Sequence, residues 1–124
     1  RFNITLEKNE IISTFGTREA LFNFPQFYLF DKQNPTMAFS NPFYQIYEGS
    51  AIASRAKIIY MDITKENNYL ANLDTLQMKQ CNLVILNYPN NPTGAIINMH
   101  RLKAWVQKAL EFDFVLINDE CYSE

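Results

Sequence analysis

Residues 82–87 (NLVILN) are the part of the sequence that most restricts the fold. Their apolar residues follow one another without the polar alternation of a strand that has one face in water. Such a run is typical of a strand in a parallel sheet that is covered on both faces. A parallel neighbour must return through a crossover, usually a helix, so this run favours a fold in which strands and helices alternate.

The rest of the chain shows that alternation. β-prone runs predict five strands in all, at residues 10–15, 36–40, 57–62, 82–87 and 114–118. Apolar residues at helical spacing predict helices at 17–30, 43–54, 73–79 and 98–112. Pro25 lies inside the first of these, and we expect a kink or a break near Asn23. The pattern predicts an α/β domain with three αβα layers and a mostly parallel sheet.

Charge and hydropathy exclude several classes of protein. The 124 residues carry 11 basic and 13 acidic side chains, a net charge of −2, spread without runs. We therefore expect no nucleic-acid partner. The longest apolar runs, such as 83–86 and 112–117, are too short to cross a bilayer, so we expect no membrane partner either.

The two cysteines, Cys81 and Cys121, lie far apart in the sequence and form no CxxC motif. This spacing argues against a zinc site and against a secreted disulfide scaffold. We interpret both as buried thiols in a reducing compartment and predict a cytoplasmic protein without a metal.

Candidate ligand-binding residues follow the strands, because ligands of open α/β sheets bind beyond the carboxyl ends of the strands. Gly16 opens a helix at which the backbone amides of Thr17 and Arg18, with the Thr17 hydroxyl, can hold a phosphate. Tyr44 follows Asn41-Pro42 and places an aromatic ring at the mouth of the sheet. Each of these features also has a plain structural explanation, as a helix cap or as core.

Two further strand ends carry polar side chains. Asn91 lies in the loop 88–94 (YPNNPTG) and offers an amide donor, although the loop is also a plausible plain turn. Asp119 directly follows the last apolar strand, and Tyr122 adds a phenol three residues later. A carboxylate half removed from water requires a cation or a hydrogen-bond donor beside it.

Together these residues match what a phosphorylated pyridine needs, and they predict a site for pyridoxal 5′-phosphate. The Asp119 carboxylate would hold the ring nitrogen protonated, which makes the ring an electron sink. Asn91 and Tyr122 would hydrogen-bond the phenolic oxygen of the ring, and Tyr44 would stack on its face. The helix start at 17–18 would hold the phosphate.

Four motifs carry a resemblance to a known family: GTREAL at 16–21, NPFYxxY at 41–47, NPTG at 91–94 and DExY at 119–122. Over nearly its whole length the chain resembles the large domain of class I/II aminotransferases, fold-type I enzymes similar to aspartate aminotransferase. The resemblance implies that residues 1–124 are part of the pyridoxal-phosphate-binding large domain, truncated at both ends. It also implies cis peptides at Asn41-Pro42 and Asn91-Pro92.

The resemblance gives the six candidate residues the roles just described. The family's phosphate turn is variable at the position of Arg18, so we expect this residue to contribute its backbone amide rather than a necessary side chain. The family's Schiff-base lysine lies on a later strand and loop, so we expect no catalytic residue within 1–124 and no activity from this piece alone.

The activity that the resemblance implies is transamination, the exchange of amino and keto groups between an amino acid and a 2-oxo acid. It also implies a homodimer that acts in amino-acid biosynthesis. For the substrate we favour the diaminopimelate pathway or aspartate.

Other functions remain open. A β-lyase, a decarboxylating synthase or a regulator with an aminotransferase-like domain would keep the same cofactor contacts. A non-enzymatic binding module would use Asp119 only as a capped carboxylate and NPTG only as a turn. A P-loop ATPase would need a GxxxxGK(S/T) loop, which this sequence lacks.

Overall fold

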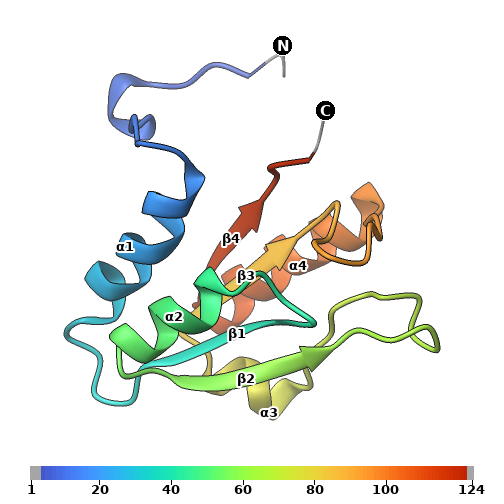
Figure 1. The fold of residues 1–124 in the computed structure, drawn as a ribbon. Helices are drawn as coiled ribbons and strands as arrows, with labels where there is room; N and C mark the ends of the chain where they lie inside the picture. The colour runs from blue at the N-terminus through green and yellow to red at the C-terminus, as the bar shows by residue number, and fades with distance from the viewer. Residues whose placement is uncertain (1–3, 123–124) are drawn as a thin grey trace.

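The strands of the computed structural model, which describes residues 4–122, form one parallel sheet (Figure 1). They are β1 (Thr36–Asn41), β2 (Lys57–Asp62), β3 (Leu83–Asn87) and β4 (Val115–Asp119). Their order across the sheet is β2-β1-β3-β4, and every neighbouring pair is parallel. All the carboxyl ends therefore lie at the same edge of the sheet, as the sequence pattern predicts.

Helices cover both faces of the sheet, which confirms the three-layer αβα arrangement (Figure 1). One face packs against α1 (Thr17–Leu29) and α2 (Ile46–Ala53). The other packs against α3 (Thr75–Gln80) and α4 (Met99–Phe112). A short 3₁₀ helix, η1 (Lys8–Glu10), precedes α1.

The two central strands supply both cores. Every residue of β3 is buried, and so are the first five residues of β1. Along β3, Leu83 and Ile85 face α1 and α2, whereas Val84 and Leu86 belong to the core under α3 and α4. The apolar run of β3 is uninterrupted because neither face of the strand meets water, as the sequence pattern predicts.

Side-chain caps fix the starts of the two helices behind the sheet. The Asn98 side chain accepts a hydrogen bond from the Arg101 amide at 2.9 Å and opens α4. The Asp74 side chain accepts one from the Gln77 amide at 2.8 Å and opens α3. These bonds satisfy amides that have no partner within the helix.

The prediction of a strand at residues 10–15 is wrong. After η1, residues 11–15 have no regular secondary structure, and within residues 4–122 no strand pairs with them. Ile12 is 85% exposed and Phe15 is 99% exposed. β-branched and aromatic residues favour a strand only where a neighbouring strand and a core receive them, and residues 11–15 have neither here.

The break expected near Asn23 is also absent, because α1 runs as one helix through Pro25. The Pro25 ring is buried, so it packs rather than disrupts. Proline removes one backbone donor of the helix. Next to that gap, the Gln26 side-chain amide donates to the Phe22 carbonyl at 2.9 Å and adds a local hydrogen bond.

The segment between β1 and α2 is longer than the sequence pattern suggests. The helix expected from residue 43 begins at Ile46, because residues 42–45 form the turn that follows the cis peptide Asn41-Pro42. The cis peptide expected at Asn91-Pro92 is confirmed as well, and Tyr88-Pro89 is a further cis peptide that was not expected.

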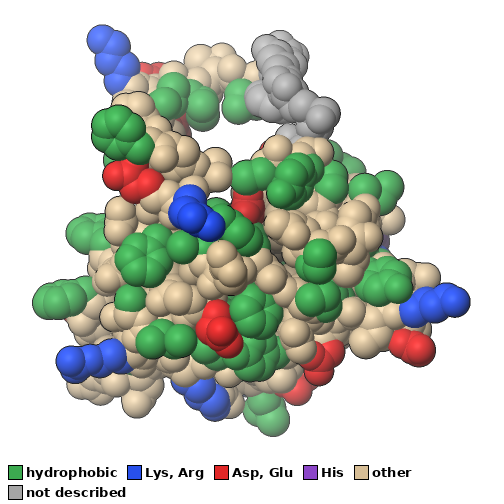
Figure 2. Space-filling view, in the orientation of Figure 1, with side chains coloured by type: hydrophobic (Ala, Val, Ile, Leu, Met, Phe, Trp, Pro, Cys, Tyr) green, Lys and Arg blue, Asp and Glu red, His purple; other side chains and the backbone are tan. Residues whose placement is uncertain are grey.

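The surface shows charges of both signs. On the face seen in Figure 2, the Lys and Arg side chains lie apart from one another rather than in one patch. Within residues 4–122, no helix is long and apolar enough to cross a membrane. The same residues contain no group of three or more His, Cys, Asp or Glu side chains placed to hold a metal ion.

The buried position of β3 makes a stability prediction. Ile85→Ala removes apolar contacts from a side chain that is 1% exposed, so we expect the free energy of unfolding to fall by about 2–5 kcal/mol. Leu110→Ala, at a position 80% exposed on α4, is the control and should change it by less than about 0.5 kcal/mol. Urea denaturation measures both, and equal losses in the two variants would contradict the assignment of β3 as the centre of the core.

Candidate cofactor site

The candidate site lies where β3 and β4 end side by side. Asn87 and Asp119 are the last residues of the two strands and are paired in register. The Asn87 side-chain amide donates to the Asp119 backbone carbonyl at 3.0 Å, and Asn87 is itself 2% exposed. This bond ties the two strand ends together at the carboxyl edge of the sheet.

Asp119 carries a nearly buried carboxylate, since the residue is only 7% exposed. The Tyr47 hydroxyl donates to its Oδ2 at 2.6 Å, and the Cys121 amide approaches its Oδ1 at 3.4 Å. A buried carboxylate without such donors would destabilise the fold by several kcal/mol. Tyr47 therefore supplies the donor that the position of Asp119 demands.

The phenol of Tyr47 is held protonated. Burial raises its pKa far above the ordinary value, and the hydrogen bond to Asp119 and the negative charge of Asp119 raise it further. Tyr47 can thus donate to Asp119 at pH values above the ordinary pKa of a tyrosine. Its position on α2 is fixed by packing, because the side chain is 1% exposed.

Tyr44 stands next to Tyr47, in the turn before α2. The two rings meet edge to face, with centroids 5.9 Å apart and planes at 89°. Nε of Arg18 donates to the Tyr44 hydroxyl oxygen at 2.8 Å. Tyr44, three residues before Tyr47, is therefore anchored to the first turn of α1.

The start of α1 faces the same edge of the sheet. Gly16 precedes the helix with φ of 89°, a conformation that favours glycine, and a Cβ there would meet nothing within 4 Å. The Glu19 amide donates to the Gly16 carbonyl at 3.2 Å, so the amides of Thr17 and Arg18 are those at the helix start that the helix itself does not pair. The Thr17 hydroxyl lies 3.2 Å from the Cys121 sulfur, which links the helix start to the segment after β4.

Asn91 and Tyr122 form the remaining part of the site. The Asn91 backbone amide donates to the Asn87 side-chain oxygen at 2.8 Å. The Asn91 side chain reaches the Tyr122 hydroxyl at 3.5 Å, a long contact, and Tyr122 is 56% exposed. The two polar groups therefore lie near each other, beside Asn87 at the end of β3.

All the sequence-predicted site residues thus gather at one end of the sheet. Contacts connect Arg18 with Tyr44, Thr17 with Cys121, and Asn91 with Tyr122. Whether these residues bind the cofactor stays a prediction.

Sequence reasoning missed three residues that hold this group together: Tyr47, Asn87 and Cys121. Tyr47 ends the NPFYxxY motif, three residues after Tyr44 in the helix expected at 43–54, and this spacing is the signal that could have pointed to it. Asn87 ends the apolar run of β3, where a buried amide has to find partners. For Cys121 the sequence offered no comparable signal.

The interpretation of both cysteines as buried is wrong for Cys121, which is exposed, whereas Cys81 is buried. Burial raises the pKa of Cys81 to about 11. For Cys121, the hydrogen bond with Thr17 lowers the pKa. The contact with Asp119, partial burial and the Asp119 charge outweigh it, and the pKa of the thiol lies above its ordinary value.

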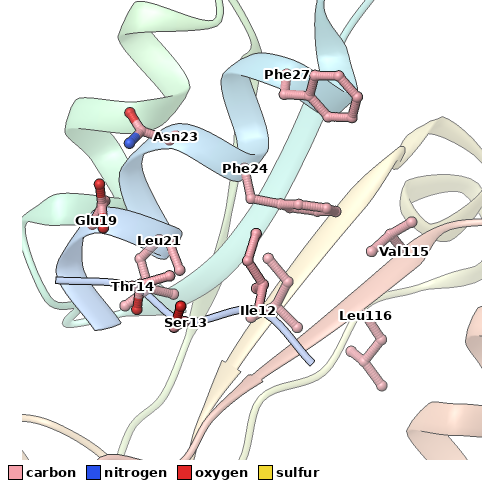
Figure 3. A pocket seen from close by; sticks show the side chains of 12 residues that line it. Ile12, Ser13, Thr14, Glu19, Leu21, Asn23, Phe24, Phe27, Val115 and Leu116 are labelled. Carbon is pink, nitrogen blue, oxygen red and sulfur yellow. The ribbon is translucent and has the colours of Figure 1, made fainter. Parts of the chain in front are cut away.

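A separate cavity of about 580 Å³ lies between residues 12–14, α1 and β4 (Figure 3). Phe24, Phe27 and Val115 give it an apolar lining. Its charged lining residue is Glu19. None of the six candidate cofactor residues lines it, so this cavity is separate from the candidate site.

Known proteins similar to this chain are aminotransferases. An aminotransferase AspB from Helicobacter pylori 26695 has 57% sequence identity and a TM-score of 0.97, over 99% of this chain and 33% of that one. An aminotransferase from Neisseria meningitidis Z2491 has 31% identity and a TM-score of 0.78, over 87% of this chain and 28% of that one. The LL-diaminopimelate aminotransferase of Aquifex aeolicus is 30% identical over 128 aligned residues, which cover all of this chain.

The chain spans about a third of the length of these relatives, 33% for the Aquifex aeolicus enzyme. The family model described as aminotransferase class I and II matches residues 1–124. Enzymes of this family use pyridoxal 5′-phosphate. Because the match extends over its full length, the chain belongs to the class I and II aminotransferases.

Proposed function

We propose that residues 1–124 are part of the large, cofactor-binding domain of a pyridoxal-phosphate-dependent aminotransferase. The whole enzyme would exchange amino and keto groups between an amino acid and a 2-oxo acid. The observation that carries this proposal is the nearly buried Asp119 carboxylate, which Tyr47 holds at the edge where the other candidate residues gather.

The chemistry of these side chains fits the cofactor. A phosphate needs clustered amide and hydroxyl donors, and the α1 start offers the backbone amides of Thr17 and Arg18 with the Thr17 hydroxyl. The Glu19 carboxylate of the same turn accepts a hydrogen bond from the Phe15 amide at 2.7 Å. A pyridine nitrogen needs an acid partner away from bulk water, and Asp119 is 7% exposed. A ring oxygen needs neutral donors, which the adjoining Asn91 and Tyr122 supply.

In this proposal each residue has a physical task. Bound pyridoxal phosphate supplies an electron sink for negative charge at the substrate α-carbon. Asp119 favours a proton on the ring nitrogen by its negative charge, and Tyr47 keeps that carboxylate oriented. Asn91 and Tyr122 stabilise negative charge on the ring oxygen by hydrogen bonds. Tyr44 covers a face of the ring and excludes water there.

Substrate, assembly and location are further parts of the proposal. The Aquifex aeolicus relative is named an LL-diaminopimelate aminotransferase, and this name supports a diaminopimelate-pathway or aspartate-type amino acid as substrate. We also propose a homodimer, as the family resemblance implies. Exposed apolar side chains on and around α1, among them Phe27 at 82% and Phe30 at 90%, offer surface for contacts outside this third of the chain. The free thiols of Cys81 and Cys121 support a reducing compartment such as the cytoplasm.

Asp119→Asn in the full-length protein tests the proposed role of the carboxylate. The amide keeps the shape of the side chain but cannot hold the ring nitrogen protonated, so we expect kcat for transamination to fall by about 100-fold or more. Tyr47→Phe removes only the orienting hydroxyl and should cost about tenfold. An Asp119→Asn variant with unchanged kcat would contradict the proposed function.

Thiol labelling tests where the cofactor binds. Iodoacetamide should modify the exposed Cys121 and spare Cys81, which is 4% exposed. Because the thiolate is the reactive form and the pKa of Cys121 is raised, the labelling rate should keep rising as the pH passes the ordinary thiol pKa. Saturating pyridoxal phosphate should slow the labelling of Cys121 about tenfold or more, because the phosphate would occupy the Thr17 side of the thiol.

Peptide mass spectrometry follows the two thiols separately in the same sample, so Cys81 serves as the internal control for unfolding. If bound pyridoxal phosphate left the labelling rate of Cys121 unchanged, the cofactor would have to bind away from the start of α1.

A further inference from the structure

The side chain of Arg18 has a partner of its own. It belongs to the first turn of α1, and its Nε donates to the Tyr44 hydroxyl oxygen at 2.8 Å. The guanidinium carbon lies 5.6 Å from the centroid of the Tyr44 ring. A hydrogen bond from a permanently charged donor is stronger than one between neutral groups. From the family resemblance we expected only the backbone amide of Arg18 to contribute.

Tyr44 depends on such a contact because its own backbone does little to orient it. It lies between β1 and α2, outside both elements, and its side chain is only half-buried. Its ring packs edge to face with the ring of Tyr47, with the centroids 5.9 Å apart and the planes at 89°. The hydrogen bond from Arg18 holds the hydroxyl end of Tyr44. The ring contact with Tyr47 and this hydrogen bond together set the plane of the Tyr44 ring.

We infer that Arg18 is a positioning residue that acts through Tyr44. This inference rests on the proposed function. The Arg18 amide would face the phosphate, while the Arg18 side chain holds the ring that covers the cofactor. One residue at the start of α1 thereby couples the site for the phosphate to the site for the pyridine ring. Replacing the side chain should weaken cofactor binding at the ring and leave the phosphate contacts intact.

A double-mutant cycle on the full-length protein tests this inference. Arg18→Met keeps the backbone amide and the length of the side chain, and Tyr44→Phe keeps the ring but removes the hydroxyl. Equilibrium dialysis of the cofactor-free protein gives the Kd for pyridoxal phosphate. We expect each single variant to raise this Kd about tenfold, and the double variant to raise it no more than either single one.

Pyridoxal without phosphate separates the inference from a direct charge effect. If Arg18 acts through Tyr44, Arg18→Met weakens pyridoxal and pyridoxal phosphate by the same factor. If Arg18→Met raised the Kd for pyridoxal phosphate but not the Kd for pyridoxal, the guanidinium would act on the phosphate. That result would overturn the inference. Losses in the two single variants that multiply in the double variant would overturn it too, as would an unchanged Kd in Arg18→Met.

Lys32→Met is the matched control, because Lys32 also places a cation over a tyrosine ring, with Nζ 5.2 Å from the centroid of Tyr28. That pair lies at the far end of α1, and the variant should leave the Kd unchanged. If the unsubstituted protein failed to bind pyridoxal phosphate, the proposed function itself would fall and the inference with it. If the unsubstituted protein binds pyridoxal phosphate and the two single-variant effects on Kd multiply in the double variant, only the inference about Arg18 is contradicted.

Discussion

The parallel pairing of β3 with β1 on one side and with β4 on the other is the constraint on which the remaining structure depends. It buries every residue of β3 and leaves no polar position along the strand until Asn87. Because the pairing is parallel, the segments that leave β1, β3 and β4 emerge at a common edge. The turn with Tyr44, the loop with Asn91 and the Asp119 carboxylate meet there as a result.

The same pairing creates an electrostatic demand. The register that places Asp119 beside Asn87 takes a carboxylate almost completely out of water. Such a group destabilises a fold unless a donor reaches it, and Tyr47 on α2 meets that demand at 2.6 Å. A helix that covers the sheet is thereby also a support of the candidate site. Packing of α2 and the chemistry at Asp119 cannot be changed independently.

The sequence predicts the sheet well where the pattern has a direct physical cause. The apolar run of β3 has such a cause, because both faces of the strand are buried. The helix expected at 98–112 has one as well, because the Asn98 side chain pairs an amide of its first turn. Residues 10–15 fail as a strand because β propensity depends on a partner strand, which a linear pattern does not reveal. Pro25 does not break α1, since its ring is buried among side chains that only the fold brings near.

The candidate site was predictable to a similar extent and for the same reason. Residues just after strands, such as Asp119 and Asn91, can be found because the edge of a parallel sheet is known in advance. Supporting residues cannot, because their partners are distant in the sequence: Tyr47 and Asp119 are separated by 72 positions. Arg18 shows this limit most clearly. The hydrogen bond from its side chain to Tyr44 joins residues 26 positions apart, and its position at the start of α1 does not predict that bond.

The most direct measurement of the central claim is a crystal structure of the full-length protein with pyridoxal 5′-phosphate. The account predicts the phosphate at the start of α1 beside Thr17, and the ring nitrogen within hydrogen-bond distance of Asp119. A ring nitrogen that faces solvent, or a cofactor bound in the cavity between α1 and β4, would contradict it.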